Sequence, residues 1–295
     1  MLSKLQVKTV EKGIPNTAEY RMYFKSNQGY ISPMHDIPLY SNFYTKVCNM
    51  IVEIPRWTNA KMEINLREPM NPIKQDIKNG LVRNVANVFP HHGYIWNYGA
   101  FPETWENPDV VDPLTGHKGD GDPLDVLEIG ERIAKRGEII QVKVLGIIGM
   151  IDEGQTDWKV IAINVHDPNA DKLNDIGDVE KYFPGYLNAT NEWLKHYKIP
   201  EGKGINTLEF NGEAQNKEFA LKVIDATHQH WIKLMMGDVK PFGLSIRNTV
   251  IGAKGLWPFQ MAEREINNRE FKTGTEPPID IAVEKSHFIT TPQQE

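Results

Sequence analysis

The alternation of apolar and polar residues along this chain predicts a protein built mainly from β-strands. Five segments either alternate with period two or run continuously apolar, as half-buried and buried strands do. These segments are residues 47–54, 60–66, 124–129, 139–151 and 158–165. Five strands of this kind suffice for a small closed barrel of the oligonucleotide/oligosaccharide-binding type.

Helical patterns follow the last of these strands. A short helix is expected from near Asp178, and a longer one over about residues 184–198, which a proline ends. Within residues 219–234 apolar side chains recur at spacings of one, three or four. This spacing predicts an amphipathic helix that packs on the barrel and stops at Gly237.

The two ends of the chain carry weaker patterns. Residues 5–10 alternate like a strand, and residues 19–31 have the pattern of a hairpin with its turn at 26–29. Residues 238–295 lack a period and are expected to extend over the surface, partly disordered. The expected fold is therefore mainly β (α+β): a five-stranded closed barrel with flanking helices and N- and C-terminal extensions. We expect residues 1–295 to form one domain.

Composition narrows the class of protein. The chain has 295 residues and a net charge of −6, and an acidic surface is not expected to bind nucleic acid. A single cysteine, Cys48, excludes an intramolecular disulfide and a thiolate metal cage. Residues 1–30 lack the apolar core of a signal peptide, and no run of roughly 18 apolar residues predicts a membrane span. We therefore expect a cytoplasmic protein that does not act at a membrane.

The richest chemistry lies in the stretch from Gly119 to Gly130. Asp120, Asp122 and Asp125 stand there at i, i+2 and i+5, with a glycine and a proline between them that prevent a helix. Side chains two apart in an extended backbone point to the same side, and the turn at the proline can bring Asp125 round to join them. Three carboxylates so close would repel one another unless cations lay among them. The stretch therefore predicts a site for a hard metal ion with oxygen ligands.

Two plainer interpretations of this stretch were weighed. Aspartates are common in solvated turns, but the apolar run 126–129 directly after them ties these carboxylates to the start of a buried strand. A calcium-binding EF-hand loop would match Asp120, Asp122 and Glu131 at its first, third and twelfth positions. It fails at the sixth, where a glycine is required and Asp125 stands.

Other polar residues are ambiguous from their pattern alone. Lys61 and Glu63 alternate with apolar neighbours and would be solvated surface charges, whereas Glu53 is a carboxylate inside an apolar strand. The adjacent pair His91 and His92 lacks the partners of a zinc site, so packing is the favoured role.

Carboxylates and cations are expected to gather at the strand ends. The carboxylates are Glu53, Glu63, Asp120, Asp122, Asp125, Asp152 and Asp157, and the cations are Lys61, Arg83, Lys159 and Lys198. Metal-binding oxygens beside Lys and Arg donors suit a phosphate or polyphosphate, whose oxygens can bind a metal ion and also accept hydrogen bonds from Lys and Arg. Mg²⁺ is the expected metal, because it prefers carboxylates, water and substrate phosphate.

The segment Asp120–Asp125 resembles the signature of the family I soluble inorganic pyrophosphatases. In that signature an aspartate, a small or polar residue, an aspartate, Pro or Glu, an apolar residue and an aspartate follow one another. Residues 52–63, 89–94, 152–159 and 197–200 are similar to further blocks of this family, in the family's own order. The resemblance covers about residues 35–235, which it implies is the catalytic core, and the long ends look like those of the eukaryotic cytosolic branch.

The resemblance implies Mg²⁺-dependent hydrolysis of pyrophosphate to two phosphates, by direct attack of a water or hydroxide that bridges metal ions. Several Mg²⁺ ions per site are expected, with Mn²⁺ as a substitute and Ca²⁺ as an inhibitor. It implies that Asp120, Asp125 and Asp157 bind metal, that Asp152 and Glu63 hold further ions, and that Glu53 supports the site. Asp122 would deprotonate the water. The two phosphates would be held by Lys61, Arg83, Tyr98, Lys159, Tyr197 and Lys198, of which Lys61, Arg83 and Tyr98 would act with Asp122 in catalysis.

The expected partners are pyrophosphate, phosphate and a second copy of the chain. Trp57, flanked by Arg56 and Thr58 outside a regular strand, is expected to be an exposed anchor of a homodimer, with His92 nearby. Two other functions stay open. A related metal-dependent phosphatase would act on organic phosphoesters, and a non-catalytic barrel would bind oligonucleotides through its aromatic residues, although it would need a basic stripe where this chain has carboxylates.

Overall fold

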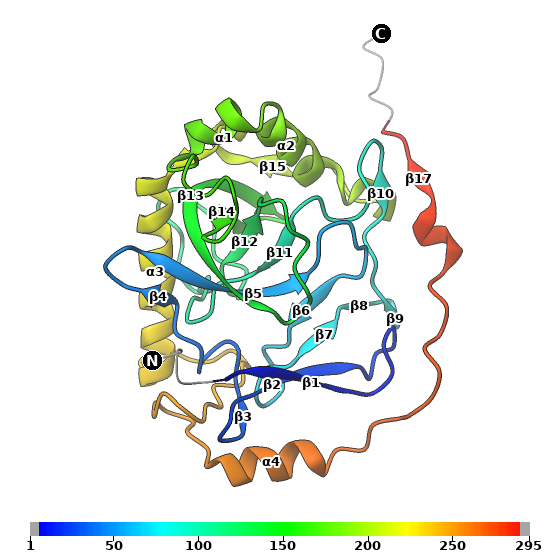
Figure 1. Ribbon diagram of the computed structural model, residues 1–295, viewed down its shortest axis with the longest axis vertical. Coiled ribbons are helices and arrows are strands. Elements are labelled where there is room, and N and C mark those ends of the chain that lie inside the picture. Colours follow the sequence, from blue (N-terminus) through cyan, green and yellow to red (C-terminus); the bar gives the residue numbers. More distant parts are fainter. Residues whose placement is uncertain (1–5, 290–295) are drawn as a thin grey trace.

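A closed ring of five strands lies at the centre of the computed structural model, which describes residues 6–289 (Figure 1). Going round the ring, the strands are β5 (Val47–Ile54), β11 (Asn97–Ala100), β12 (Asp125–Glu128), β14 (Gln155–Asn164) and β13 (Ile139–Asp152). All neighbours are antiparallel except β12 and β14, which are parallel, and β13 closes the ring by pairing with β5. The expectation of a mainly β fold with flanking helices is confirmed.

One of the five predicted ring strands is wrong. Residues 60–66 contribute β6 (Met62–Ile64), which pairs with β7 (Ile73–Gln75) in another sheet, and β11 takes its place in the ring. Alternation of apolar and polar residues predicts a strand but not the strand with which it pairs. The place of β11 in the ring depends instead on a close approach of its backbone to the backbone of β5. A Cβ atom at Gly99 would lie 1.9 Å from the carbonyl oxygen of Ile51 on β5, so this position requires glycine.

The second sheet lies beside the ring and shares its core. Its strands run in the order β1 (Lys8–Lys12), β2 (Arg21–Lys25), β7 and β6, and β3 (Tyr30–Ile31) also pairs with β2. The predicted hairpin is therefore confirmed as β2 and β3, while residue 5 of the first predicted strand lies outside the described residues. Phe24 and Ile31 of this sheet belong to the same apolar cluster as Leu127 and Ile161 of the ring.

The predicted helices are present with small shifts of their ends. They are α1 (Ile176–Tyr182), α2 (Tyr186–His196) and α3 (Lys217–Met236). Gly237 ends α3 with a φ of 83°, a conformation that glycine adopts without strain. The buried residues Ala220, Val223 and Ile224 of α3 pack against apolar residues of β13 and β14, and in Figure 1 the helix runs along one side of the ring. Among residues 6–289 no helix combines the length and apolar character needed to cross a bilayer.

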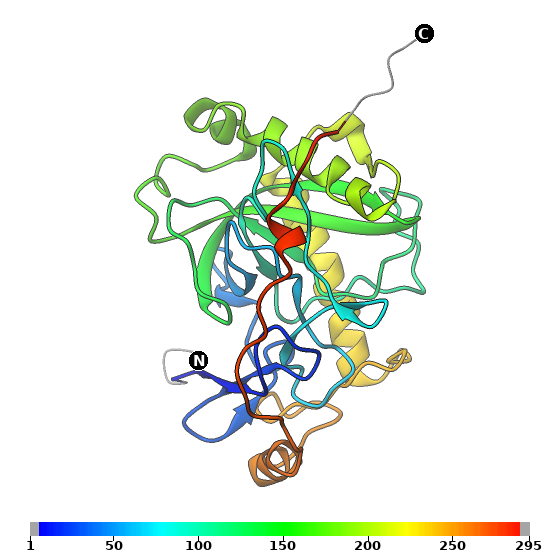
Figure 2. The same ribbon diagram turned by 90° about the vertical axis from the view of Figure 1, so that its right-hand side faces the viewer.

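Short strands complete the description. They are β4 (Tyr40–Asn42), β8 (Ile77–Lys78), β9 (Leu81–Val82), β10 (Asn87–Val88), β15 (Thr207–Leu208), β16 (Gln215–Asn216) and β17 (Ser286–His287). Residues 238–289 run over the surface as expected, but they include α4 (Phe259–Asn267), which the sequence pattern did not predict. Figure 2 shows this C-terminal extension crossing one face from α4 to β17, where it pairs in parallel with β10. Residues 290–295 lie outside the described part of the chain.

A buried clasp fastens the C-terminal extension to the core. The carboxylate of Asp36 accepts hydrogen bonds from the backbone N–H groups of Ser32, Thr249 and Val250 at 2.8 to 3.0 Å. Beside it, burial lowers the pKa of His35 to about 4. The neutral ring accepts from the indole N–H of Trp231 at 3.0 Å and donates to the carbonyl oxygen of Ser245 at 2.9 Å. Residues 32–36 thus hold the start of the extension through buried polar contacts.

Replacing Asp36 by Asn should destabilise the protein, because the amide nitrogen would place two donors against backbone donors. We expect Asp36→Asn to lower the free energy of unfolding by about 2 to 3 kcal/mol, the scale of lost hydrogen bonds to a buried charge. Urea denaturation followed by circular dichroism measures the change. The control is Asp238→Asn, which alters an exposed aspartate of the extension. Equal midpoints for the two variants would contradict a clasp at Asp36.

Candidate active site

A polar cleft opens between the ring and the second sheet. Its volume is about 480 Å³. It brings together seven of the residues predicted from the sequence: Glu53, Lys61, Glu63, Tyr98, Asp120, Asp122 and Asp125. They come from β5, from β6 and the residue before it, from β11, and from the start of β12 and the loop that leads into it. The structure thus places these seven residues together, including Lys61 and Glu63, which alternation alone would have assigned to the surface.

Backbone hydrogen bonds fix the loop that carries the aspartates. The N–H of Gly121 donates to the carbonyl oxygen of Glu106 at 2.8 Å, and the N–H of Glu106 donates to the carbonyl oxygen of Asp122 at 2.9 Å. Asp120 also accepts the N–H of Asp122 through its side chain at 2.9 Å. At Gly119 a Cβ atom would lie 2.4 Å from the Glu106 backbone, so the close approach of the two segments requires glycine. Residues 106 and 119–122 are thus held as one unit.

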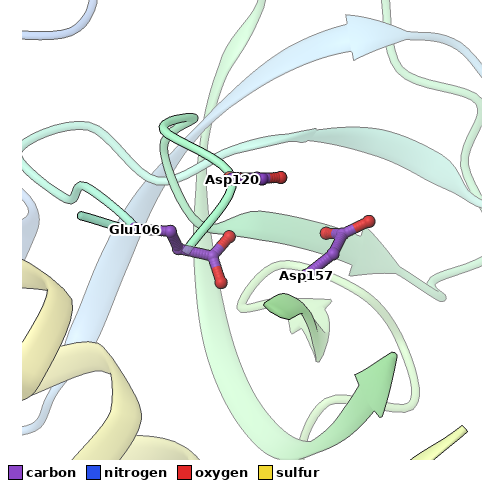
Figure 3. A group of neighbouring side chains, drawn as sticks. All are labelled: Glu106, Asp120 and Asp157. Carbon is purple, nitrogen blue, oxygen red and sulfur yellow. The ribbon is translucent and has the colours of Figure 1, made fainter. Parts of the chain in front are cut away.

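Three carboxylates converge beneath this loop (Figure 3). One oxygen from each of Glu106, Asp120 and Asp157 lies within 4.8 Å of the other two. Burial, and then the negative charges of Asp120 and Asp157, raise the pKa of Glu106 well above its usual value. Burial, and then Asp122 and Asp157, do the same to the pKa of Asp120. The cluster is unfavourable for charged carboxylates alone, and a cation among them would relieve that repulsion.

Glu106 is a site residue that the sequence analysis missed. Its side chain is 3% exposed, and Oε1 accepts the N–H of Trp158 at 3.2 Å. Oε2 is buried and has no hydrogen-bond partner among residues 6–289, an arrangement that suits a metal ligand. Glu106 stands within residues 102–118, which are rich in Pro, Asp and Gly and have the pattern of a loop. The signal for Glu106 in the sequence was an acidic residue directly after Trp105, and such a residue is also found in ordinary loops.

Lys159 connects the cluster to the cleft. Its ammonium contacts the carboxylate of Asp125, lies 2.6 Å from Oδ1 of Asp157, and donates to the hydroxyl of Tyr98 at 3.0 Å. The parallel pairing of β12 with β14 sets Asp125 directly opposite Lys159. Burial by itself would lower the pKa of Lys159, but Asp125 and Asp157 outweigh it and raise the pKa well above the usual value. The amine therefore stays charged although its side chain is only 4% exposed.

Further predicted residues lie around the cleft without lining it. Arg83 pairs with Asp76 and with Glu201, at 3.1 Å each, and Asp76 also lies 3.6 Å from the ammonium of Lys61. Neither Asp76 nor Glu201 was a candidate from the sequence. Arg83 is thereby linked to Lys61, which lines the cleft, because both side chains contact the carboxylate of Asp76.

The remaining predicted residues form a separate group. Lys198 pairs with Asp152 at 2.5 Å, and its ammonium lies 5.7 Å from the centre of the Tyr197 ring. Tyr197 stacks on Trp193 with ring centres 4.6 Å apart. Burial, and then the negative charge of Asp152, raise the pKa of Tyr197 well above its usual value. Lys198 lies two residues beyond His196, the last residue of α2.

Within residues 6–289 the histidine pair belongs to no group of potential metal ligands. The Nδ1–H of His92 donates a hydrogen bond to the carbonyl oxygen of Trp57, 3.1 Å away, and burial lowers the pKa of His91. The residues that could hold a metal are carboxylates, as the sequence predicted. An all-oxygen donor set of this kind fits a hard divalent cation and gives no support to zinc.

Comparison with known proteins identifies the family. Residues 50–232 match the family model described as inorganic pyrophosphatase. An inorganic pyrophosphatase of Drosophila melanogaster is 60% identical over 247 residues, 82% of this chain and 73% of that protein. The human inorganic pyrophosphatase is 54% identical over 244 residues, 82% of this chain and 84% of that protein. The structure of inorganic pyrophosphatase from Schistosoma japonicum superposes with a TM-score of 0.91 at 52% identity, covering 96% of this chain and 100% of that one.

The matched region contains the acidic cluster, Lys159 and most of the cleft. The sequence resemblance and the structural likeness thus agree on the same family. The chain belongs to the family I soluble inorganic pyrophosphatases and is an inorganic diphosphatase, an enzyme that hydrolyses pyrophosphate.

Proposed function

We propose that the enzyme depends on Mg²⁺ and hydrolyses pyrophosphate by direct attack of water on phosphorus. One observation carries this proposal: the oxygen cluster of Glu106, Asp120 and Asp157 lies within reach of the fixed, charged Lys159. A substrate with many phosphate oxygens can bind a metal and an ammonium group together. A site built from carboxylates alone would repel such a substrate, and one built from cations alone would not hold the metal.

The carboxylates divide into two proposed tasks. Glu106, Asp120 and Asp157 would hold one ion, and Asp125, Asp152 and Glu63 would provide oxygens for others. Glu53 would act as a positioning residue: it is buried, and its Oε1 accepts the N–H of Ile64 at 2.6 Å, which ties β5 to β6. When bound, Mg²⁺ would acidify water and neutralise charge on the phosphates. Mn²⁺ is an expected substitute, because it takes the same oxygen ligands.

The remaining side chains would act on the water and the substrate. Asp122 lines the open cleft and would accept the proton of the attacking water. Lys61, Arg83, Lys159 and Lys198 would hold phosphate oxygens, together with the hydroxyls of Tyr98 and Tyr197. These donors would stabilise the charge that builds up on the leaving phosphate, so no covalent intermediate is required.

Phosphate release should require Mg²⁺ and should be inhibited by Ca²⁺, which can occupy the same oxygens with longer bonds and looser geometry. The assay compares release from pyrophosphate with release from nucleotides and sugar phosphates, with and without exhaustive chelation. A strong preference for pyrophosphate is expected. Full activity after chelation would end the proposal, and faster release from organic phosphoesters would favour the phosphatase alternative.

Asp122 and Asp120 should respond differently to the same substitution. Asp120→Asn should weaken metal binding and be partly rescued by more Mg²⁺, as expected for a ligand. Asp122→Asn should leave metal and pyrophosphate binding nearly intact and lower kcat by about 100- to 10,000-fold, the scale of a lost general base. Higher pH should restore part of this loss, because the solution then supplies the deprotonation. A rate of Asp122→Asn that is flat with pH, or full rescue by Mg²⁺, would make Asp122 another ligand.

We also infer that the protein forms a homodimer through the surface around Trp57. This side chain is 55% exposed and Arg56 lies 5.9 Å from its ring centre. Phe89 and Phe288 are also exposed. They directly follow the paired strands β10 and β17 and stack with ring centres 5.2 Å apart. Exposed aromatic rings beside arginine are common at interfaces.

Light scattering at micromolar concentration should therefore give twice the mass of the chain. Trp57→Ser should shift the equilibrium toward the monomer, because an aromatic anchor contributes strongly to binding energy. Exposed Tyr44 offers a matched control on β4–β5, and Tyr44→Ser should leave the mass unchanged. A wild-type protein with the mass of one chain would rule the dimer out.

A further inference from the structure

A second cleft lies beside the active-site cleft, on the C-terminal extension. Its volume is about 470 Å³. Three cationic side chains line it, Arg67, Arg247 and Lys254, and no Asp or Glu does. This is unexpected for a chain with 39 acidic and 33 basic residues, and it contrasts with the active-site cleft, where five carboxylates gather. We call this feature the basic groove.

The three cations of the basic groove have no carboxylate partners. Within residues 6–289, none of their side chains takes part in an ion pair or a hydrogen bond. Arg247 lies 4.9 Å from the centre of the Trp257 ring. Stacking of this kind holds the plane of a guanidinium group and leaves the N–H donors at its edge available. Arg247 is thus fixed in place but not neutralised.

Local structure holds the other two cations at the groove. A Cβ atom at Gly237 would lie 2.5 Å from the ammonium of Lys254, so the amine rests on the end of α3, where helix carbonyls favour a positive charge. A Cβ atom at Gly243 would lie 2.9 Å from Nη1 of Arg67, so glycine lets that guanidinium lie over the backbone. Ser245 also lines the groove, and its hydroxyl has no hydrogen-bond partner among residues 6–289.

We propose that the basic groove binds a phosphate group, at a site separate from the catalytic cleft. Three like charges lining one cleft repel one another, and a bound anion would relieve that repulsion. Two guanidinium groups and an ammonium group match the several oxygens of phosphate. No metal is needed there, since no carboxylate has to be neutralised. Arg67 and Leu244 line both clefts, so the bound phosphate would lie next to the active site.

The phosphate could be free inorganic phosphate or the terminal group of a larger ligand. Both are recognised by the same chemistry, and the experiment separates them by using inorganic phosphate and ADP as probes. Each probe is titrated into the full-length protein labelled with ¹⁵N-glycine, in the presence of EDTA. The amides of Gly243 and Gly255, which line the groove, report binding there. This readout needs no turnover, so its failure is distinct from a failure of the proposed hydrolysis.

We expect inorganic phosphate to shift both amides, and to bind at least about tenfold more weakly to the double variant Arg247→Gln/Lys254→Gln, since each charge-assisted hydrogen bond contributes about a factor of ten or more. The matched control is Lys172→Gln, which removes one exposed charge near the first residue of α3. Asp175 there accepts the N–H of Lys217, and α3 separates that point from Lys254 by about 30 Å. The control should bind phosphate like the wild type.

The responses to inorganic phosphate and to ADP distinguish the two possible ligands. Shifts with inorganic phosphate assign the site to free phosphate, and shifts with ADP alone assign it to the phosphate of a larger ligand. Binding should weaken as sodium chloride is raised, because salt screens exposed charges. The proposal is overturned if neither probe moves the Gly243 and Gly255 amides, or if the double variant responds as the wild type does.

Discussion

Repulsion among buried carboxylates is the constraint on which the rest of this structure depends. Glu106, Asp120 and Asp157 meet in a space that burial makes unfavourable for negative charge; Asp157 raises the pKa of both other acids, and Asp120 raises that of Glu106. An isolated chain segment would move such groups apart. They stay together because the closed ring fixes β14, and because backbone hydrogen bonds join residue 106 to the loop 119–122. The stability of the fold therefore offsets the unfavourable free energy of holding these three carboxylates together.

Lys159 limits that cost by lying between Asp157 of the cluster and a further carboxylate, Asp125. Its charge faces Asp125 across the parallel pairing of β12 and β14 and faces Asp157 along its own strand. Of the strand pairs in this ring only β12 and β14 are parallel, and their pairing places Asp125 directly opposite Lys159. Because the strand register holds the Lys159 ammonium beside both carboxylates, the side chain does not have to reorient, and its positive charge is in place before any ligand binds.

Sequence reasoning succeeded where the chemistry is contiguous and failed where only folding brings residues together. Asp120, Asp122 and Asp125 lie within six positions, and their mutual repulsion could be recognised from spacing alone. Glu106 could not be recognised in this way, because its role depends on a neighbouring segment that packs against its backbone. Similarly, β11 joins the ring through a glycine contact with β5 that no periodicity reports. The clasp at Asp36 binds residues more than 200 positions away, and its donors are backbone groups that any sequence would offer.

The clasp has a consequence for the catalytic cleft itself. Phe242 and Leu244 line that cleft, and Phe242 packs 6.2 Å from the ring of Trp105, yet both residues follow the region that matches the family model. The clasp at residues 32–36 holds this segment in position. Part of the wall of the catalytic cleft is therefore built by the C-terminal extension, so substitutions at Phe242 and Leu244 should change the shape of the cleft without removing any of the proposed reacting groups.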